Sequence, residues 1–520
     1  MSASSKKMLR KEQAAAKMTE KQLAEQKEAK KLKLYTIAFV AVVAIVLVIA
    51  LTVGITKGIA TTGINEKNTV ALTVGEHKIS NAELNYYYID SVNNFYSQYG
   101  SYASLFGIDT SKSLNDQFSN EETGETWADY FINSAKDSAL SVYALNDAAA
   151  AAGYTLSAEE QSIIDSNIAT LEMYGMMYGY ENGEEYVKAM YGRGASIEGY
   201  RKYTEMAALA DSYYSAYGSS LTYEDADLRA AEEGKYNEFS SYNYNYYYLA
   251  ASKFEDDAAK AEEAANSLMG VETVEAFDEA IAALSINAET TASSTNCKDY
   301  PYSSIIDVIR EWVTSDDRIE GDMTVIANTS TTDGVESILG YYVVRFESSN
   351  DNNFALKNVR HILAMFQGGT TDSTTGVTTY SDEEKAEAKA RAEELLATWE
   401  AGEKTEDSFA VLANEKSNDG DGTTGGLYAD IYPGQMVTNF NDWCFDDNRF
   451  VGETGIVETE YGYHVMYFVG DSDITYRDYQ IKTQLQNEEM NSWYNGLREA
   501  MTVVEGSTKY MSKDIILGNG

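Results

Sequence analysis

Short runs of alternating apolar and polar residues are separated along the chain by segments of helical periodicity. Residues 70–74 alternate as a strand, and the capping pair Ser80 and Glu83 predicts that a helix starts soon afterwards. From about residue 126 to 232, apolar residues recur at three- and four-residue spacing, with a break at Gly153. The pattern therefore predicts a first region, residues 70–232, that is mainly helical.

The pattern changes at about residue 238 to strands that flank helices. It predicts one unit over residues 238–350 and a second over residues 354–471, whose long helix is capped by Ser381 and Glu384. Residues 474–501 are helical again, with an apolar face. Because a lone helix of this length would leave that face exposed, we expect residues 474–520 to complete the first helical region.

The two units are internal repeats. Residues 311–326, EWVTSDDRIEGDMTVI, align without gaps on residues 442–457, DWCFDDNRFVGETGIV. The matched pairs include Trp312 with Trp443, Asp316 with Asp447, Arg318 with Arg449 and Gly321 with Gly452. Further on, the Gly-Tyr-Tyr at 340–342 aligns with the Gly-Tyr-His at 462–464, after extra residues in the first copy. The first unit contains no histidine, so a site that uses one can exist only in the second unit.

An uncharged run of 23 residues, 34–56, precedes the folded part. A bilayer core needs about 20 apolar residues, so this run predicts a single transmembrane helix that is not cleaved. Residues 1–33 carry 10 Lys and Arg against 4 Asp and Glu, which predicts a cytoplasmic basic tail. Residues 57–69 then read as a linker, and everything after it is expected outside the cytoplasm.

Charge and cysteine content narrow the possible functions. The chain has 40 Lys and Arg against 82 Asp and Glu, and the residues after 56 hold 30 of the former and 78 of the latter. Such an acidic surface repels polynucleotides, so we expect no nucleic-acid partner. The two cysteines, Cys297 and Cys444, are too few for a disulfide scaffold, and each is predicted to be a buried free thiol.

One of the three histidines, His464, lies within an apolar, aromatic run that alternates like a strand, ETEYGYHVMYF over residues 458–468. A histidine in this setting is either a hydrogen-bonded core residue or a member of a site. A lone residue does not distinguish the two.

The second unit resembles the parvulin-type peptidyl-prolyl isomerases. The matching segments follow the family order and are RHIL (360–363), FAVLANEKSND (409–419), GGL (425–427), GQMVTNFNDWCF (434–445) and TEYGYHV (459–465). The order of the domains is also similar to that of membrane-attached SurA/PrsA-type foldases, in which a helical chaperone domain is combined with parvulin units and one such unit can be degenerate.

This resemblance implies site residues. His361 and His464 fall on the family's paired histidines, Thr459 on the position that orients one imidazole, and Asp419 on a position that the family fills with Cys or Asp. A buried pair with an acidic neighbour can fix tautomers and the local field, which makes all four the candidate catalytic residues. The loop before Leu427 looks one residue short and lacks the family's Asp.

The resemblance also implies a slot for the prolyl ring. We assign its substrate-binding residues, against the alternative of simple core packing, as Leu427, Met436, Phe440, Phe445 and Tyr461. Tyr461 replaces a residue that is often Ser in the family. Residues 366–384 contain no Arg or Lys, so we expect no preference for phosphorylated substrates. Two histidines and an aspartate could form a metal triad, but the family pattern accounts for them without a metal or any other cofactor.

The expected fold class is α+β, with a transmembrane helix, a SurA-like helical domain, a degenerate parvulin unit and a second unit with the site. The leading hypothesis is a membrane-anchored, extracytoplasmic isomerase and chaperone that acts on unfolded or newly exported polypeptides containing X-Pro bonds. The alternative is a holdase or interaction protein that uses the parvulin units only as a scaffold.

Overall fold

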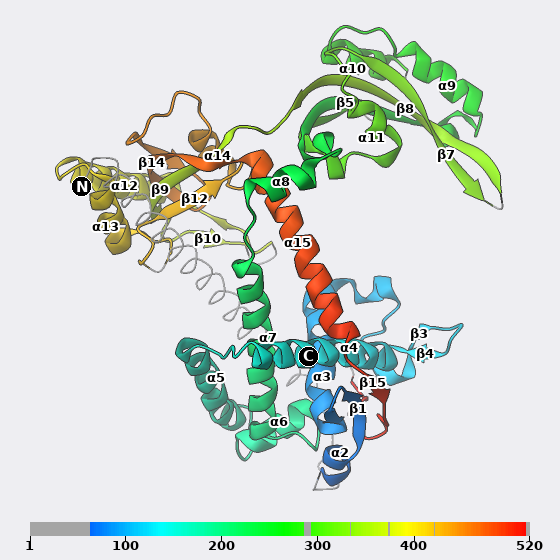
Figure 1. Cartoon of the computed structure of the whole chain (residues 1–520), viewed down its shortest axis with the longest axis vertical. Coiled ribbons are helices and arrows are strands. Elements are labelled where there is room, and N and C mark those ends of the chain that lie inside the picture. Colours follow the sequence, from blue (N-terminus) through cyan, green and yellow to red (C-terminus); the bar gives the residue numbers. More distant parts are fainter. Residues whose placement is uncertain (1–62, 285–292, 333, 373–374, 421, 516–520) are drawn as a thin grey trace. The chain divides into compact units, whose positions relative to one another are not determined.

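A computed structural model describes residues 63–284, 293–332, 334–372, 375–420 and 422–515 of the chain (Figure 1). The described residues form two compact units, one of residues 63–222 with 486–515 and the other of Tyr223–Leu485. The predicted α+β class is confirmed for this part of the chain. No helix among the described residues is long and apolar enough to cross a membrane. The predicted segments 1–33 and 34–56 lie outside the described residues.

The unit of residues 63–222 with 486–515 is mainly helical, as the periodicity predicts for the first region. Its helices are α2 (Ile64–Asn68), α3 (Asn81–Tyr99), η1 (Gly100–Phe106), η2 (Leu114–Asp116), α4 (Trp127–Ala151), α5 (Ala158–Met177), α6 (Gly183–Tyr191) and α7 (Ile197–Ser220). Its strands are β1 (Val70–Val74), β2 (His77–Ser80), β3 (Phe118–Asn120), β4 (Glu125–Thr126) and β15 (Val503–Glu505). The break predicted at Gly153 is present between α4 and α5.

Capping residues start these helices where the sequence predicts. The Ser80 hydroxyl accepts the Glu83 N–H at the start of α3, while the Glu83 carboxylate is occupied by the Tyr143 hydroxyl. His77 precedes this cap by three residues. It lies in β2, where its Nε2 is 2.9 Å from an Asp147 carboxylate oxygen.

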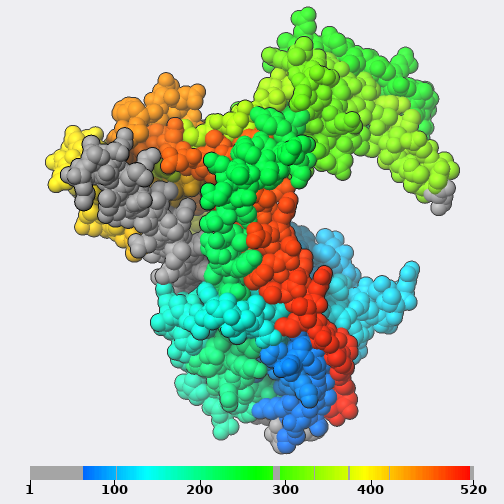
Figure 2. All heavy atoms as spheres, viewed as in Figure 1, coloured from blue at the N-terminus to red at the C-terminus, as the bar shows by residue number. Residues whose placement is uncertain are grey.

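The last described residues belong to this unit. Strand β15 pairs antiparallel with β1 and completes a three-stranded sheet in the order β15-β1-β2, and the blue and red segments adjoin in Figure 2. Helix α15 (Tyr476–Glu499) has residues in both units, and its Trp493 ring stacks on Tyr217 with 3.9 Å between centroids.

The other unit contains the two repeats. The elements up to the end of the first repeat are α8 (Asp225–Glu232), η3 (Tyr236–Phe239), β5 (Ser241–Ala250), η4 (Ala251–Phe254), α9 (Ala258–Ser267), α10 (Val274–Ala283), β6 (Thr295–Pro301), η5 (Tyr302–Ser304), α11 (Asp307–Val313), β7 (Met323–Thr332) and β8 (Val335–Asn350). Those of the second repeat are β9 (Ala355–Met365), β10 (Thr370–Thr371), β11 (Thr378–Thr379), α12 (Asp382–Glu400), α13 (Glu406–Lys416), β12 (Leu427–Ile431), α14 (Thr438–Cys444), β13 (Thr454–Glu458) and β14 (Gly462–Thr475).

Both repeats build the same antiparallel sheet. The strand order is β6-β5-β8-β7 in the first repeat and β12-β9-β14-β13 in the second, so the strands correspond in sequence order. One difference is the hairpin of β7 and β8, which continues beyond the end of β5 as a two-stranded ribbon (Figure 1). This ribbon holds the extra residues that the alignment requires in the first copy.

The residues aligned between the repeats make equivalent contacts. The guanidinium carbon of Arg318 lies 4.8 Å from the Trp312 ring centroid, and that of Arg449 lies 4.4 Å from the Trp443 ring. Gly321 and Gly452 have φ of 87° and 89°, and each donates its N–H to a phenylalanine carbonyl on the last strand of its repeat, Phe346 in β8 and Phe468 in β14. The internal repeat is thus present in the geometry as well as in the sequence.

Candidate active site in the second repeat

The register of the two central strands places both histidines on one face of the sheet. His361 of β9 lies opposite Met466, and His464 of β14 lies opposite Leu363, so the histidines are diagonal neighbours. Residues two apart along a strand point to the same face, which directs both imidazoles away from helices α12 and α13. The sequence motif alone could not give this register.

A continuous hydrogen-bonded chain of side chains runs through the pair. The two Nδ1 atoms are 3.0 Å apart, and His464 Nε2 is 2.9 Å from the Thr459 hydroxyl. At the other end, His361 Nε2 is 3.2 Å from a carboxylate oxygen of Asp419, which also accepts the Tyr428 hydroxyl at 2.6 Å. The structure therefore brings together all four candidate catalytic residues and adds Tyr428.

Loop contacts with β9 position Asp419. The Ser417 hydroxyl accepts the N–H of Leu363, and the Asn418 N–H donates to the Leu363 carbonyl, so the start of the loop follows the strand. At the end of the loop, the Gly426 carbonyl accepts the His361 N–H. A Cβ on Gly426 would overlap the His361 carbonyl oxygen, and its φ of 65° also favours glycine.

Burial determines the protonation of this chain. His361 and His464 are 2% and 5% exposed, while the Asp419 side chain, at one end of the hydrogen-bonded series, is 38% exposed. Desolvation, aided by the neighbouring His361, lowers the pKa of His464 from 6.5 to about 3. The hydrogen bond from His361, with a further one from Tyr428, lowers the pKa of Asp419 to about 2. At neutral pH the site therefore holds a neutral His464 and an ionised Asp419.

When each imidazole carries one proton, these charges fix the donor and the acceptor in every hydrogen bond of the series. Because the Asp419 carboxylate can only accept, the His361 proton is on Nε2 and its Nδ1 accepts. His464 then donates from Nδ1, and its Nε2 accepts the hydroxyl proton of Thr459. The Thr459 oxygen in turn accepts the N–H of Tyr461 at 3.2 Å. Every polar atom of the imidazole pair has a partner in this arrangement.

Helix α14 supplies an apolar wall against the pair. The Phe440 ring is edge-on to both imidazoles, with centroids 5.4 Å from His361 and 5.3 Å from His464. Met436 lies half-buried against the same core cluster, which also includes Trp443, Cys444 and Met466. Burial raises the pKa of the Cys444 thiol to about 12, so it is a protonated core residue, and both predicted free cysteines are confirmed as buried.

The assignment of Leu427 to the slot is wrong. Leu427 pairs with Arg360 and therefore points to the helix-covered face, whereas Tyr428 pairs with Val359 and points to the histidine face. The Tyr428 ring lies 4.6 Å from the His361 ring and 6.1 Å from Phe440. A strand alternates with period two, so an error of one residue in alignment moves a side chain across the sheet.

The two other predicted slot residues lie at the edge of the site or outside it. Phe445 follows Phe440 by five residues, which is about 140° around a helix, and its ring packs edge-on against Phe354 at 6.5 Å. Tyr461 is 55% exposed, its N–H donates to the Thr459 hydroxyl and its carbonyl accepts the Phe366 N–H. Their part in substrate binding stays a prediction.

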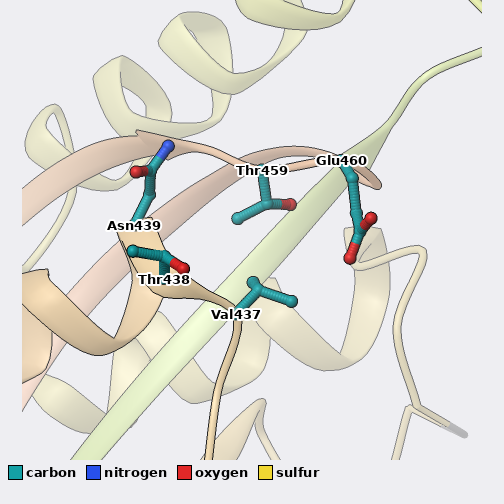
Figure 3. Close-up of a pocket in the computed structure, with 5 residues that line it drawn as sticks. All are labelled: Val437, Thr438, Asn439, Thr459 and Glu460. Carbon is teal, nitrogen blue, oxygen red and sulfur yellow. The ribbon is translucent and has the colours of Figure 1, made fainter. Parts of the chain in front are cut away.

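A hollow of about 300 Å³ opens beside the pair. It is lined by Val437, Thr438, Asn439, Thr459 and Glu460, from the start of α14 and the turn between β13 and β14 (Figure 3). Thr459 connects this hollow to the hydrogen-bonded chain, because the same side chain bonds His464. The described residues contain no cluster of ligating side chains suited to a metal ion.

The first repeat has tyrosines at the matching positions. Tyr342 pairs with Ile326 as His464 pairs with Val457, and Tyr246 opposes Val344 as His361 opposes Met466. The Tyr246 and Tyr342 rings are 5.9 Å apart. The position of the second histidine was aligned with Tyr342 from sequence, and the register adds Tyr246 as the counterpart of His361.

Comparison with known proteins confirms the resemblance for this part of the chain. Residues 333–470 match the PPIC-type PPIase domain family. Among solved structures, peptidylprolyl isomerase PrsA from Bacillus cereus is 22% identical, with coverage of 28% of this chain and 49% of its own and a TM-score of 0.18. PrsA from Bacillus subtilis is 15% identical, with 74% and 91% coverage and a TM-score of 0.27.

A third similar structure is peptidyl-prolyl isomerase ESS1 from Candida albicans, at 26% identity, 22% and 63% coverage and a TM-score of 0.17. This chain thus spans about half the length of the Bacillus cereus protein that it matches. No curated protein sequence matches the chain.

Proposed function

We propose that the second repeat catalyses cis-trans isomerisation of X-Pro bonds in polypeptides. The observation that carries this proposal is the buried chain Thr459–His464–His361–Asp419 closed against the edge of Phe440. The match to the PPIC-type PPIase domain over residues 333–470 supports the same reaction.

The reaction needs no bond to substrate and no cofactor. Rotation about a peptide bond crosses a barrier of about 18–20 kcal/mol because resonance is lost as the amide twists. A prolyl ring of the substrate placed against Phe440, Met436 and Tyr428 would be held in an apolar slot while the residue before the proline rotates about the peptide bond. The neutral His464 adds no cationic charge to the slot. The fixed dipoles of the hydrogen-bonded side chains act more strongly there than in water because the site is buried.

The first repeat is proposed to be inactive. Tyr246 and Tyr342 cannot form an imidazole pair, and the described residues of that sheet have no counterpart of the hydrogen bonds that link a hydroxyl, two imidazole rings and a carboxylate. An isomerase signal from the whole chain is therefore assigned to the second repeat.

A chaperone role for the helical unit is the second candidate function. Several large apolar side chains of this unit are exposed to solvent around η1 and α4, namely Tyr102, Leu105, Phe106, Phe118 and Tyr130. The Phe106 ring also contacts Phe95 and Tyr99, so these side chains continue an aromatic cluster from the core outwards. Exposed apolar surface of this kind is suited to unfolded polypeptide segments.

We also propose that residues 34–56 anchor the chain in a membrane, with residues 1–33 in the cytoplasm and the remainder outside. The support is the length of the uncharged run and the basic flank. Protease added to intact cells should digest the acidic part and spare the basic tail. Protection of the whole chain would refute this orientation.

A protease-coupled cis-trans assay on the full chain tests the enzyme proposal. Turnover above the uncatalysed rate is expected, with a marked loss in His464→Leu and Met436→Ala. Tyr342→Leu is the matched control in the first repeat and should leave the rate unchanged. A background rate in the unchanged chain would defeat the proposal, and an unchanged rate in both site variants would dismiss the site.

The chaperone role has its own assay. The full chain should suppress aggregation of a chemically denatured client, and Leu105→Ser with Phe106→Ser should weaken that suppression. Aggregation that proceeds equally with and without the chain would count against this role.

A further inference from the structure

The hollow beside Thr459 has one ionisable lining residue, Glu460. Its side chain is exposed, and it forms no hydrogen bond or ion pair with any other residue that the structure describes. In Figure 3 its carboxylate stands at the end of the hollow away from Asn439, across from Val437. The hollow therefore combines an apolar contact, neutral polar groups and one negative charge.

The cations near this part of the sheet already have carboxylate partners. Lys385 is 4.0 Å from Glu458, Arg449 pairs with Glu453 and Asp446, and Arg360 bonds Glu406 at 2.9 Å. Residues 354–471 contain 8 Lys and Arg against 22 Asp and Glu. The negative charge of Glu460 is thus left for a ligand.

The neutral lining residues can also accept hydrogen bonds from a donor. The Asn439 amide nitrogen donates one of its two hydrogens to the Glu458 carbonyl at 2.8 Å, and its amide oxygen can accept a hydrogen bond from a ligand. The Thr438 hydroxyl is a further acceptor, and the Val437 side chain offers an apolar surface. A lysine ammonium has three donors and no acceptor, and its stem can lie along apolar surface.

We propose that this hollow is the subsite for the side chain of a residue that flanks the proline, and that Glu460 makes it selective for Lys or Arg. The inference rests on the proposed isomerase function and adds its substrate class. A volume of about 300 Å³ is at the lower limit of small-molecule pockets, so it suits one side chain of an extended peptide. Glutamate or a phosphorylated residue at the same position is repelled.

The test compares peptides on the full chain by NMR exchange spectroscopy. Lys, Leu or Glu is placed before the proline in one series and after it in another, with all other residues neutral. In the series that reaches the hollow, kcat/KM for the Lys peptide should exceed that for the Glu peptide by roughly fivefold, the scale of exposed ion pairs. This ratio should fall as salt is raised.

Glu460→Gln should reduce the ratio to below about twofold, and Glu460→Lys should invert it. Glu458→Gln is the matched control: it removes the same charge two residues away, at a side chain outside the hollow that bonds Tyr463. The control should keep the ratio of the unchanged chain. Equal rates for Lys and Glu peptides in both series, or an unchanged ratio in Glu460→Gln, would overturn the proposal.

Affinity separates this proposal from the enzyme proposal. The same peptides, labelled with a fluorophore, are titrated with the full chain and followed by anisotropy. If no peptide is isomerised, the proposed function fails, while tighter binding of the Lys peptide that depends on Glu460 still supports the subsite. If all peptides are isomerised and bound equally, the subsite fails and the function stands.

Discussion

Replacing Thr459 with valine keeps the shape of the side chain and removes its hydroxyl. That hydroxyl is the donor to His464 Nε2, and its oxygen also accepts the Tyr461 N–H. Thr459 is 8% exposed and His464 is 5% exposed, so the hydrogen bond between them is buried. The substitution therefore leaves the buried Nε2 of His464 without a donor. The His464 ring is then no longer held in the tautomer with its proton on Nδ1.

The expected cost follows from this burial. A buried polar group that loses its partner destabilises the fold by about 1–3 kcal/mol. That corresponds to roughly 5- to 150-fold faster hydrogen exchange at amides of β13 and β14 that exchange through opening of this sheet. Hydrogen exchange read by mass spectrometry on the full chain measures this effect locally, without assuming that several domains unfold together.

Two further variants make the result specific. Thr459→Ser retains the hydroxyl and should restore most of the protection and of the isomerase rate. Thr438→Val makes the same chemical change at an exposed residue and should leave exchange in β14 unaltered. The reasoning is refuted if Thr459→Val exchanges like the unchanged chain, or if Thr459→Ser is as unstable as Thr459→Val.

Three other outcomes are expected. First, the pKa of His464 is about 3 in the folded state and 6.5 in the unfolded state, so between these values the unfolded state binds one more proton. The stability of the fold that depends on this residue is therefore full above pH 6.5 and is lost as the pH falls towards 3. Hydrogen-exchange protection in β14, measured against pH, should show this loss, and His464→Leu should remove it. Phe440→Ala should destabilise the second repeat by about 3–5 kcal/mol and lower kcat/KM, measured by exchange and by the coupled assay, while retention of both would exclude Phe440 as the wall of the slot. A Cβ on Gly462 would overlap the Ala364 carbonyl oxygen and one on Gly340 would overlap that of Leu249, so each Gly→Ala variant should speed exchange in its own repeat only; equal effects in both repeats would contradict their independence.

The sequence by itself determined the α+β class, the internal repeat and the four polar residues of the site. Periodicity and capping residues such as Ser381 are local, and the structure has the α12 capping box where they indicate it. The repeat could be recognised from the aligned Trp and Arg residues, because the Arg side chain lies over the Trp ring in both copies.

Tertiary structure alone decided which side chains share a face. Leu427 and Tyr428 are neighbours in sequence, and only the pairing with β9 shows that Tyr428 reaches His361 while Leu427 points to the helices. The same holds for Tyr246 as the counterpart of His361, and for the hollow at Glu460, whose lining comes from two segments about twenty residues apart. Strand register and burial depend on contacts between distant parts of the chain, so the neutral state of His464 also became visible only in the folded structure.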